Sequence, residues 1–435
     1  MNQEKVVLVQ PSLARLYPLE GARHKLEPLG LEMIAVHNPH NTPVEIYDMD
    51  VYPDWVDFEG FLERERPSTI GIMVNTPLVK EAREITQRAR KVLGDVFVVA
   101  GGNHPTHEPQ HTLDYVQPDL VWKSDGENFL QVLAETDLRE QARQGNRIFN
   151  SARLGGLGNM KEDKFAMDSL KFPLRHKPRD YFFTSVQASR GCLWKCIYCG
   201  SADKDVVWRT AGNILAEIDG LQEQELLDKK IYFLDDCFLD NPKRVRELCK
   251  GISDRKFSPP PQFWIETRTN TITEKLLDIL KTAGCYQITF GLESGNQRVL
   301  DSLGKQLDVT KVPETLALVR KHGINIRANF MIGHYGETEE EVWDTIHLAE
   351  LLQKRDLATT IGFYNVLPLP GTPLYRRIQE EGGTKIEKGF EDFKWYGDTV
   401  SKISQVDPRR LDELRVEACR RVKEASNAHR KSVDY

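Results

Sequence analysis

Three closely spaced cysteines are the residues whose type and spacing most clearly indicate chemistry. Of the seven cysteines, Cys192, Cys196 and Cys199 follow the spacing C-x3-C-x2-C, and the others are scattered. Three thiolates on one loop can hold three irons of a [4Fe–4S] cubane and leave the fourth iron without a protein ligand. Such an open metal position leaves room for a substrate or cofactor. A zinc site needs a fourth ligand at typical spacing, and no nearby Cys or His supplies one.

Polar residues alternate with apolar ones along three predicted strands that follow the cysteines, at residues 263–268, 287–293 and 324–331. Because successive side chains of a strand point to opposite faces, the polar sets should share the inner face of a barrel. These sets are Trp264, Glu266 and Arg268; Thr289, Gly291 and Glu293; and Arg327 and Asn329. Charges there are costly unless paired or used, so they form a buried ion-pair network or bind a polar ligand. The second interpretation suits the carboxyl ends of barrel strands, where barrel active sites lie.

Six strand–helix units are predicted to position these residues, within a domain at residues 181–390. The strands are expected at 184–189, 230–235, 262–268, 287–293, 325–333 and 361–367, and the helices at 213–224, 242–254, 274–283, 309–321 and 339–354. Six units are too few for a closed eight-unit barrel and fit a (βα)6 partial barrel of the TIM type. Residues 391–435 form a C-terminal extension, whose charged amphipathic helix at 408–429 should pack on the outside.

The N-terminal part, residues 1–140, also alternates short apolar strands with helices. Strands are expected at 6–9, 44–47, 69–74, 96–100 and 120–122, with the clearest helix at 79–92. This pattern predicts an α/β, Rossmann-like domain with a parallel sheet covered on both faces. Ligands of such sheets lie at the carboxyl ends of the strands, here segments 10–12, 75–77 and 101–106. Gly101 and Gly102 either let a ligand approach or make a turn. Residues 141–180 are interpreted as a linker.

Bulk composition limits the classes of function. The chain has 435 residues, 40% hydrophobic and 29% charged, as in a globular protein with a full core. Its net charge of -6 argues against general nucleic-acid binding. It has no apolar run of membrane-spanning length and no signal-peptide pattern, and its odd cysteine count does not suggest a disulfide framework. We therefore expect a cytoplasmic protein without nucleic-acid or membrane partners.

The cysteine loop, with Tyr198 at an aromatic position, resembles that of the radical S-adenosylmethionine (SAM) superfamily. In that family the loop is C-x3-C-x-aromatic-C after the first strand of a (βα)6 partial barrel. The resemblance implies that SAM chelates the open iron through its amino and carboxylate groups. One electron, from a donor such as flavodoxin or ferredoxin, then cleaves SAM to methionine and a 5′-deoxyadenosyl radical. That radical removes a hydrogen atom from the substrate.

Four further segments resemble cofactor-binding motifs of the same family. Segment 234–236 matches the place that binds the SAM amino group, and 291–295 matches the motif whose acidic residue contacts the ribose. Segments 333–338 and 367–373 match the parts that lie near the adenine. The resemblance thereby implies SAM-binding roles for Asp235, Asp236, Glu293, Ser294, Gly333 and Leu367. Further candidates for SAM contacts are Tyr198 of the cysteine loop and the inward-facing Arg268, Arg327 and Asn329.

Segments 28–32 and 100–106 resemble the cobalamin-binding-type domain that precedes many radical SAM barrels. Segment 125–127 stands where that group often has Gly-Glu-Gly-Glu. The D-x-H-x-x-G motif for cobalt ligation by His is absent. The domain could therefore hold cobalamin or keep the shape without it, and we expect the second.

Two reactions suit this architecture. The chain resembles the radical SAM diol dehydratases of aminoglycoside biosynthesis, which implies removal of the 3′-hydroxyl of a paromamine-like, apramycin-pathway substrate with a separate NADPH-dependent reductase. Dehydration needs an acid and a base, for which Glu266, Asp236 and His334 are candidates. Carboxylates would also bind the ammonium groups of an amino sugar. The alternative is a cobalamin-dependent C-methyltransferase. An iron–sulfur electron carrier is disfavoured, because it needs neither the polar lumen nor the SAM motifs.

Overall fold

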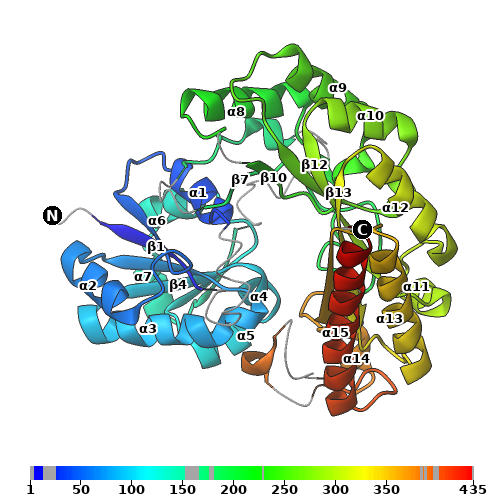
Figure 1. Cartoon of the computed structure of the whole chain (residues 1–435). Coiled ribbons are helices and arrows are strands. Elements are labelled where there is room, and N and C mark those ends of the chain that lie inside the picture. Colours follow the sequence, from blue (N-terminus) through cyan, green and yellow to red (C-terminus); the bar gives the residue numbers. More distant parts are fainter. Residues whose placement is uncertain are drawn as a thin grey trace. The chain divides into compact units, whose positions relative to one another are not determined.

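The structure is a computed structural model (Figure 1) that describes residues 4–12, 26–151, 166–175, 181–227, 230–382, 386, 389–394 and 401–433. The chain divides into two compact units. The first comprises Met1–Phe183 with Phe390–Asp392, and the second comprises Thr184–Gly389 with Phe393–Tyr435. Parts of the predicted linker, residues 152–165 and 176–180, lie outside the described residues.

The first unit contains a six-stranded sheet with the order β2-β1-β3-β4-β5-β6 and parallel pairing throughout. Its strands are β1 (Val6–Gln10), β2 (Val44–Asp48), β3 (Thr69–Met73), β4 (Phe97–Gly101), β5 (Leu120–Lys123) and β6 (Ile148–Asn150). The five predicted strands are confirmed. Strand β6 falls in the predicted linker and is a correction: it has three residues and pairs only with β5, so it is too short to show an alternating pattern.

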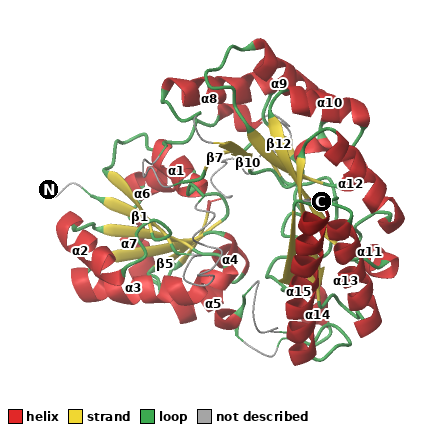
Figure 2. Cartoon of the chain, viewed as in Figure 1, coloured by secondary structure: helices red, strands yellow, loops and turns green. Residues whose placement is uncertain are grey.

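Helices cover both faces of this sheet, as the doubly wound pattern predicts (Figure 2). Helices α2 (Trp55–Glu65) and α3 (Val79–Leu93) contribute to one buried cluster. Helices α1 (Leu29–Val36) and α6 (Phe129–Glu135) contribute to another. Shorter elements are η2 (Thr76–Leu78), α4 (Asn103–His107), α5 (Pro109–His111), η3 (Thr112–Val116), α7 (Leu138–Arg143), η6 (Ala166–Ser169) and η10 (Phe390–Asp392).

The second unit contains a sheet with the sequential order β14-β13-β12-β11-β10-β7, whose first and last strands are not neighbours. Its strands are β7 (Phe183–Val186), β10 (Lys230–Phe233), β11 (Phe263–Thr267), β12 (Cys285–Glu293), β13 (Asn325–Ile332) and β14 (Thr360–Asn365). This open arrangement confirms the predicted six-strand partial barrel. A small antiparallel pair, β8 (Ser189–Arg190) and β9 (Val207–Trp208), was not predicted; the cysteine loop lies between its two strands.

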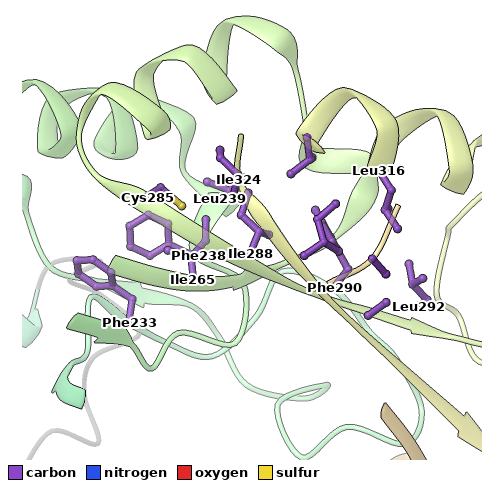
Figure 3. Packing of buried hydrophobic residues seen from close by; sticks show 14 of the residues in the cluster. Phe233, Phe238, Leu239, Ile265, Cys285, Ile288, Phe290, Leu292, Leu316 and Ile324 are labelled. Atoms are coloured by element: carbon purple, nitrogen blue, oxygen red, sulfur yellow. The ribbon is translucent and has the colours of Figure 1, made fainter. Parts of the chain in front are cut away.

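The apolar side of the barrel strands packs against the surrounding helices. Ile265, Ile288, Phe290 and Leu292 lie in one buried cluster with Leu316 of α12 (Figure 3). This places the alternate residues of β11 and β12 on the lumen side, as predicted. The helices are α8 (Ala211–Glu223), α9 (Pro242–Asp254), α10 (Glu274–Thr282), α11 (Gln297–Ser302), α12 (Val312–Lys321), α13 (Glu339–Lys354) and α14 (Pro373–Glu380), with the short η7 (Phe238–Asp240), η8 (Thr269–Thr271) and η9 (Val309–Lys311).

The C-terminal helix α15 (Pro408–Val433) packs against α13 and β14 (Figure 1). Its apolar stripe, with Leu411, Leu414 and Ala418, is buried in the same cluster as the barrel strands. Arg421 pairs with Glu350 of α13 at 3.4 Å. The predicted external amphipathic helix is therefore confirmed.

Two expectations from composition can also be compared with the structure. Within the described ranges, no helix combines the length and apolarity needed to cross a bilayer. None of the seven cysteines is joined in a disulfide bond in the described part of the chain.

Candidate active site

The three clustered cysteines lie on the loop between β8 and β9, after the first barrel strand. Gly191 opens this loop with a φ of 83°, in the left-handed region. A Cβ atom at Gly191 would lie 2.3 Å from the carbonyl oxygen of Asp205, so only glycine fits this turn. Cys196 is buried, whereas Cys192 and Cys199 are half-buried. The loop thus presents all three thiols from one short segment.

Burial keeps the thiols of Cys192 and Cys199 protonated when no iron is bound. Desolvation is the main cause that raises the pKa of Cys192 to about 12, and it also raises the pKa of Cys199. Iron ligands must be thiolates, so assembly of a cluster here must release protons.

Backbone hydrogen bonds fix the cysteine loop from two sides. The amide of Ile197 donates to the carbonyl of Leu303, which follows α11, at 3.1 Å. The carbonyl of Ile197 in turn accepts from the amide of Leu374 in α14 at 2.8 Å. Two elements far apart in the sequence therefore converge on the loop and hold its conformation.

Asp240 and Arg268 contact the cysteine loop through the Trp194 side chain. The Asp240 carboxylate accepts from the Trp194 indole at 2.9 Å and from the Leu193 amide at 3.4 Å. The Arg268 guanidinium lies 4.0 Å above the indole ring, and its Nη1 donates to the Cys196 sulfur at 3.3 Å. Its Nε and Nη2 atoms are buried without a hydrogen-bond partner among the described residues. They are unused donors next to the cysteines, and an anionic cluster or a carboxylate would satisfy them.

The two adjacent carboxylates predicted to bind SAM differ in environment. Asp235 is 3% exposed and accepts from the Ala188 amide at 3.0 Å and from the Ser189 hydroxyl, with Arg244 3.8 Å away. Its burial raises its pKa, and these partners oppose the rise. The Asp235 side chain thus braces β7 and β8. Asp236 is exposed and accepts from the Ser201 hydroxyl beyond the cysteines at 2.9 Å.

Glu293 and Tyr198 contact each other, and Lys305, which the sequence did not indicate, contacts both. The Tyr198 hydroxyl donates to Glu293 Oε1 at 2.8 Å. Lys305 Nζ donates to the same oxygen at 2.8 Å and lies 3.2 Å from the Tyr198 hydroxyl. Burial and the adjacent carboxylate raise the pKa of Tyr198 well above its ordinary value, so the phenol stays protonated. Ser294, in contrast, bonds to Thr345 of α13 at 3.1 Å.

A second polar group lies deeper along the strands. The Tyr232 hydroxyl donates to Glu266 Oε1 at 2.5 Å, and burial raises the pKa of Glu266. Arg327 donates to the Tyr364 hydroxyl at 2.9 Å and to Asn329 Oδ1 at 3.3 Å. The lumen therefore combines a carboxylate, a guanidinium and aromatic side chains. Such a set can bind a polar substrate or move a proton.

The segments predicted near the adenine are buried in the structure. His334 is 0% exposed, and neither ring nitrogen has a hydrogen-bond partner in the described part of the chain. The amides of Gly333 and His334 donate to Glu337 Oε2 at 2.7 and 3.0 Å. Burial raises the pKa of Glu337. Leu367 is 5% exposed. His334, a candidate acid or base, is therefore fully buried, and the loop lies close to α15: the Leu411 side chain is 3.2 Å from a Cβ built at Gly333.

Sequence reasoning missed Lys305, Trp194, Asp240 and Tyr232. Trp194 stands between two of the cysteines, and Tyr232 stands between two apolar residues of β10, so both carried a signal. Lys305 and Asp240 lie in connections whose side-chain direction no periodic pattern predicts. Cys237 is 3% exposed, and its thiol lies 3.4 Å from the Thr267 hydroxyl.

In the first unit, side chains at the carboxyl ends of β3 and β4 form a chain of contacts. Thr76 Oγ1 lies 3.1 Å from His104 Nδ1, and His104 Nε2 lies 3.0 Å from His111 Nδ1. The Phe390 ring packs edge-on against both imidazoles, with centroid distances of 5.0 and 4.8 Å. Both nitrogens of His104 are thus already engaged. Burial lowers the pKa of His104 to about 3, so its ring is neutral.

The glycine pair in this region serves packing. Gly102 has a φ of 112°, and a Cβ there would lie 2.8 Å from the Val74 carbonyl oxygen. A Cβ at Gly101 would make only ordinary contacts with Trp122. The sequence left open whether these glycines admit a ligand or make a turn, and at Gly102 the tight turn explains the glycine.

Comparison with protein families identifies both parts of the chain. Residues 186–349 match the Radical SAM superfamily, and residues 20–134 match the B12 binding domain. The first range includes the cysteine loop and strands β10 to β13. The second includes the sheet from β2 to β5.

Two relatives align with most of the chain. An uncharacterized methyltransferase of Pyrococcus horikoshii is 26% identical over 394 residues, which cover 86% of this chain and 83% of that protein. Cytidylyl-2-hydroxyethylphosphonate methyltransferase of Streptomyces wedmorensis is 26% identical over 453 residues, covering 87% of this chain and 82% of that protein. Both relatives are named as methyltransferases.

A solved structure shows the same two-part fold. The radical S-adenosylmethionine methyltransferase TsrM from Kitasatospora setae, with cobalamin and a [4Fe-4S] cluster bound, superimposes with a TM-score of 0.67 at 20% identity. The match covers 88% of this chain and 78% of that one. At this identity the likeness concerns the fold alone. The chain therefore contains a B12 binding domain followed by a radical SAM domain.

Proposed function

We propose that the protein is a cobalamin-dependent radical SAM methyltransferase. The observation that carries this proposal is the order of the two domains, shared over most of the chain with relatives named as methyltransferases. This reverses the preference drawn from the sequence, where cobalamin seemed dispensable and dehydration was favoured. The specific methyl acceptor stays outside the proposal.

The residues on the cysteine loop fit a [4Fe–4S] cluster with bound SAM. Cys192, Cys196 and Cys199 would hold the irons, and the unused donors of Arg268 would face the negative charge. The exposed carboxylate of Asp236 suits an amino group, and Glu293 suits ribose hydroxyls. When bound, these cofactors supply a reactive carbon radical that removes hydrogen from a substrate. A one-electron donor of the flavodoxin or ferredoxin kind is the partner that this chemistry requires.

The first unit fits cobalamin only without an imidazole ligand from His104. Both ring nitrogens of His104 are engaged, by Thr76 and His111. The parallel sheet nevertheless offers the usual ligand edge, at the crevice between β1 and β3 where the strand order reverses. Cobalamin held there would supply the methyl group.

Within the lumen, the chain's own residues would bind and orient the acceptor. Glu266 and Arg327 carry opposite charges on strands β11 and β13, and Tyr232 and Tyr364 hold them through hydrogen bonds. A substrate with a cationic and an anionic group would pair with both. The Tyr232 phenol stays protonated because burial raises its pKa, so it can donate to the Glu266 carboxylate.

Product analysis of the anaerobically reconstituted protein tests the proposal. The protein is reconstituted with iron, sulfide and hydroxocobalamin, reduced, and incubated with SAM and candidate acceptors. We expect cobalamin to stay bound through gel filtration and S-adenosylhomocysteine to form beside 5′-deoxyadenosine. A variant with Cys192, Cys196 and Cys199 changed to Ala should form no 5′-deoxyadenosine. Turnover without cobalamin, and without S-adenosylhomocysteine, would contradict methyl transfer.

Diol dehydration is kept as a second candidate because of one observation. Phe390, together with His104 and His111, covers the ends of β3 and β4, in the region where a cobalamin-binding domain presents its ligand edge. If these side chains prevent cobalamin from binding, the protein would catalyse a reaction that needs only SAM. An example is loss of a hydroxyl from an aminoglycoside-like sugar, with Glu266 as base. The expected products would be 5′-deoxyadenosine and a dehydrated sugar, reduced further by an NADPH-dependent reductase. The same product analysis separates the two candidates.

A further inference from the structure

The carboxylate of Glu293 is held in an unusual backbone setting at the end of β12. Glu293 has a φ of 65°, a left-handed conformation that is unfavourable for a residue with a side chain. The pairing between β12 and β13 shifts register between Gly291 and Glu293. An irregularity that coincides with an unfavourable backbone angle aims one side chain away from its regular direction.

Gly291 provides the space into which this carboxylate turns. A Cβ atom at Gly291 would lie 2.3 Å from Glu293 Oε1 and 3.2 Å from Lys305 Nζ. Any larger residue at this position would displace the carboxylate or the ammonium group. The absence of a Cβ at Gly291 and the left-handed backbone at Glu293 therefore both serve to place the Glu293 carboxylate beside Lys305.

Lys305 completes the arrangement from the connection that follows α11. It is 5% exposed, and its Nζ donates to Glu293 Oε1 at 2.8 Å and to the Tyr198 hydroxyl at 3.2 Å. An ammonium group buried this deeply needs such partners. The same connection contributes the Leu303 carbonyl that accepts from Ile197 of the cysteine loop. The side chain and the backbone of one connection thus both contact the cysteine loop.

We infer that Lys305 is a positioning residue that holds the Glu293 carboxylate at the SAM site and couples it, through Tyr198, to the cysteine loop. Without the ammonium group, the carboxylate would be buried next to a phenol alone and would turn toward water. Glu293 would then leave the position from which it can accept hydrogen bonds from a ribose. The inference rests on the radical SAM assignment and does not depend on methyl transfer.

The test compares Lys305→Met with Lys305→Arg in the full-length protein with its reconstituted cluster. Lys305→Met keeps the length of the side chain and removes its charge, whereas Lys305→Arg restores a cation. We expect Lys305→Met to retain iron but to bind SAM at least tenfold more weakly, and Lys305→Arg to recover most of the affinity. The electron paramagnetic resonance spectrum of the reduced cluster should also respond less to SAM in Lys305→Met.

Two further variants keep the inference falsifiable. Gly291→Ala should weaken SAM binding as Lys305→Met does, and the double variant should be no worse than either single one. Lys311→Met is the matched control, because Lys311 is exposed and its ion pair among the described residues is with Asp308 at 3.6 Å. Wild-type SAM affinity in both Lys305→Met and Gly291→Ala would overturn the inference. So would loss of iron in Lys305→Met combined with normal SAM affinity in Gly291→Ala. None of these readouts needs cobalamin or an acceptor, so they can fail independently of the proposed function.

Discussion

Neighbouring residues of the same type have opposite roles in this protein because burial differs between them. Asp235 and Asp236 are adjacent, yet the first is buried among donors and the second is exposed beside Ser201. A buried carboxylate is stable only with partners, so Asp235 holds strands together. An exposed one can exchange its partner for a ligand. Similarity to a family motif indicates both aspartates as binding residues, but only their contacts in the structure show that the two have different roles.

Burial also changes the titration of His104, and this change predicts that the stability of the folded chain depends on pH. Its pKa is about 3 in the folded chain instead of the ordinary 6.5. The unfolded chain therefore gains a proton below pH 6.5 that the folded chain cannot accept. Stability that is present at neutral pH should be lost as the pH falls through this window. The linkage gives a loss of about 2 kcal/mol between pH 7.5 and pH 5.

The prediction can be measured by chemical denaturation of wild type and His104→Gln at both pH values. The variant cannot titrate, so its free energy of unfolding should fall less on acidification, by about the same 2 kcal/mol. Other groups titrate equally in the two proteins, which isolates the contribution of His104. An identical pH dependence in the variant would show that the imidazole is accessible to protons in the folded chain.

At the scale of elements, the cysteine loop depends on its first turn. Gly191 has a φ of 83° and no room for a Cβ next to the Asp205 carbonyl, 2.3 Å away. Gly200 lies at the other end of the cysteine set and has open space around it. The two glycines therefore form a matched pair within one loop.

We predict that Gly191→Ala disrupts the cluster loop and that Gly200→Ala does not. Left-handed strain costs about 1–3 kcal/mol, and the clash with backbone adds to it. Gly191→Ala should therefore lose most of its iron and the absorbance of the cluster after reconstitution. Iron determination and visible absorbance of the two variants, prepared side by side, provide the measurement. Equal iron contents would mean that the turn can change without displacing the cysteines.

At the scale of the whole molecule, each of the two units has apolar clusters of its own. Leu62 of α2 is 0% exposed in a cluster of the first unit, and the barrel strands are buried in a separate cluster of the second. Units with separate cores can unfold in separate steps. The cluster loop and the sheet of the B12 binding domain can thus be perturbed one at a time.

We predict that Leu62→Ala destabilises the first unit and leaves the iron content unchanged. Removal of a buried Leu side chain costs about 2–5 kcal/mol. Val56→Ala is the control on the same helix, because Val56 is 77% exposed. Thermal unfolding followed by circular dichroism, with iron analysis of the same samples, provides the measurement. A parallel loss of iron in Leu62→Ala would contradict separate cores.

Much of this architecture follows from periodicity in the sequence. Period-two and helical patterns predicted all six strands of the barrel, five of the six in the first sheet and the external helix α15, because burial on one face imposes those periods. The spacing of Cys192, Cys196 and Cys199 indicated a cluster because ligands on one short loop remain close in any fold. Strand β6, with three residues on an edge, escaped because it is too short to carry a period.

Only the tertiary structure decided which side chains meet across the chain. Lys305 lies 107 residues from Tyr198, and Asp240 lies 46 residues from Trp194, yet each pair is in contact. Long-range contacts of this kind depend on how connections leave the strands, and no local pattern records the direction of a connection. The same holds for the contact of Phe390 with His104 and for the complete burial of His334. The sequence therefore determined the elements and the short spacing of the three predicted cluster ligands, whereas packing determined what surrounds them.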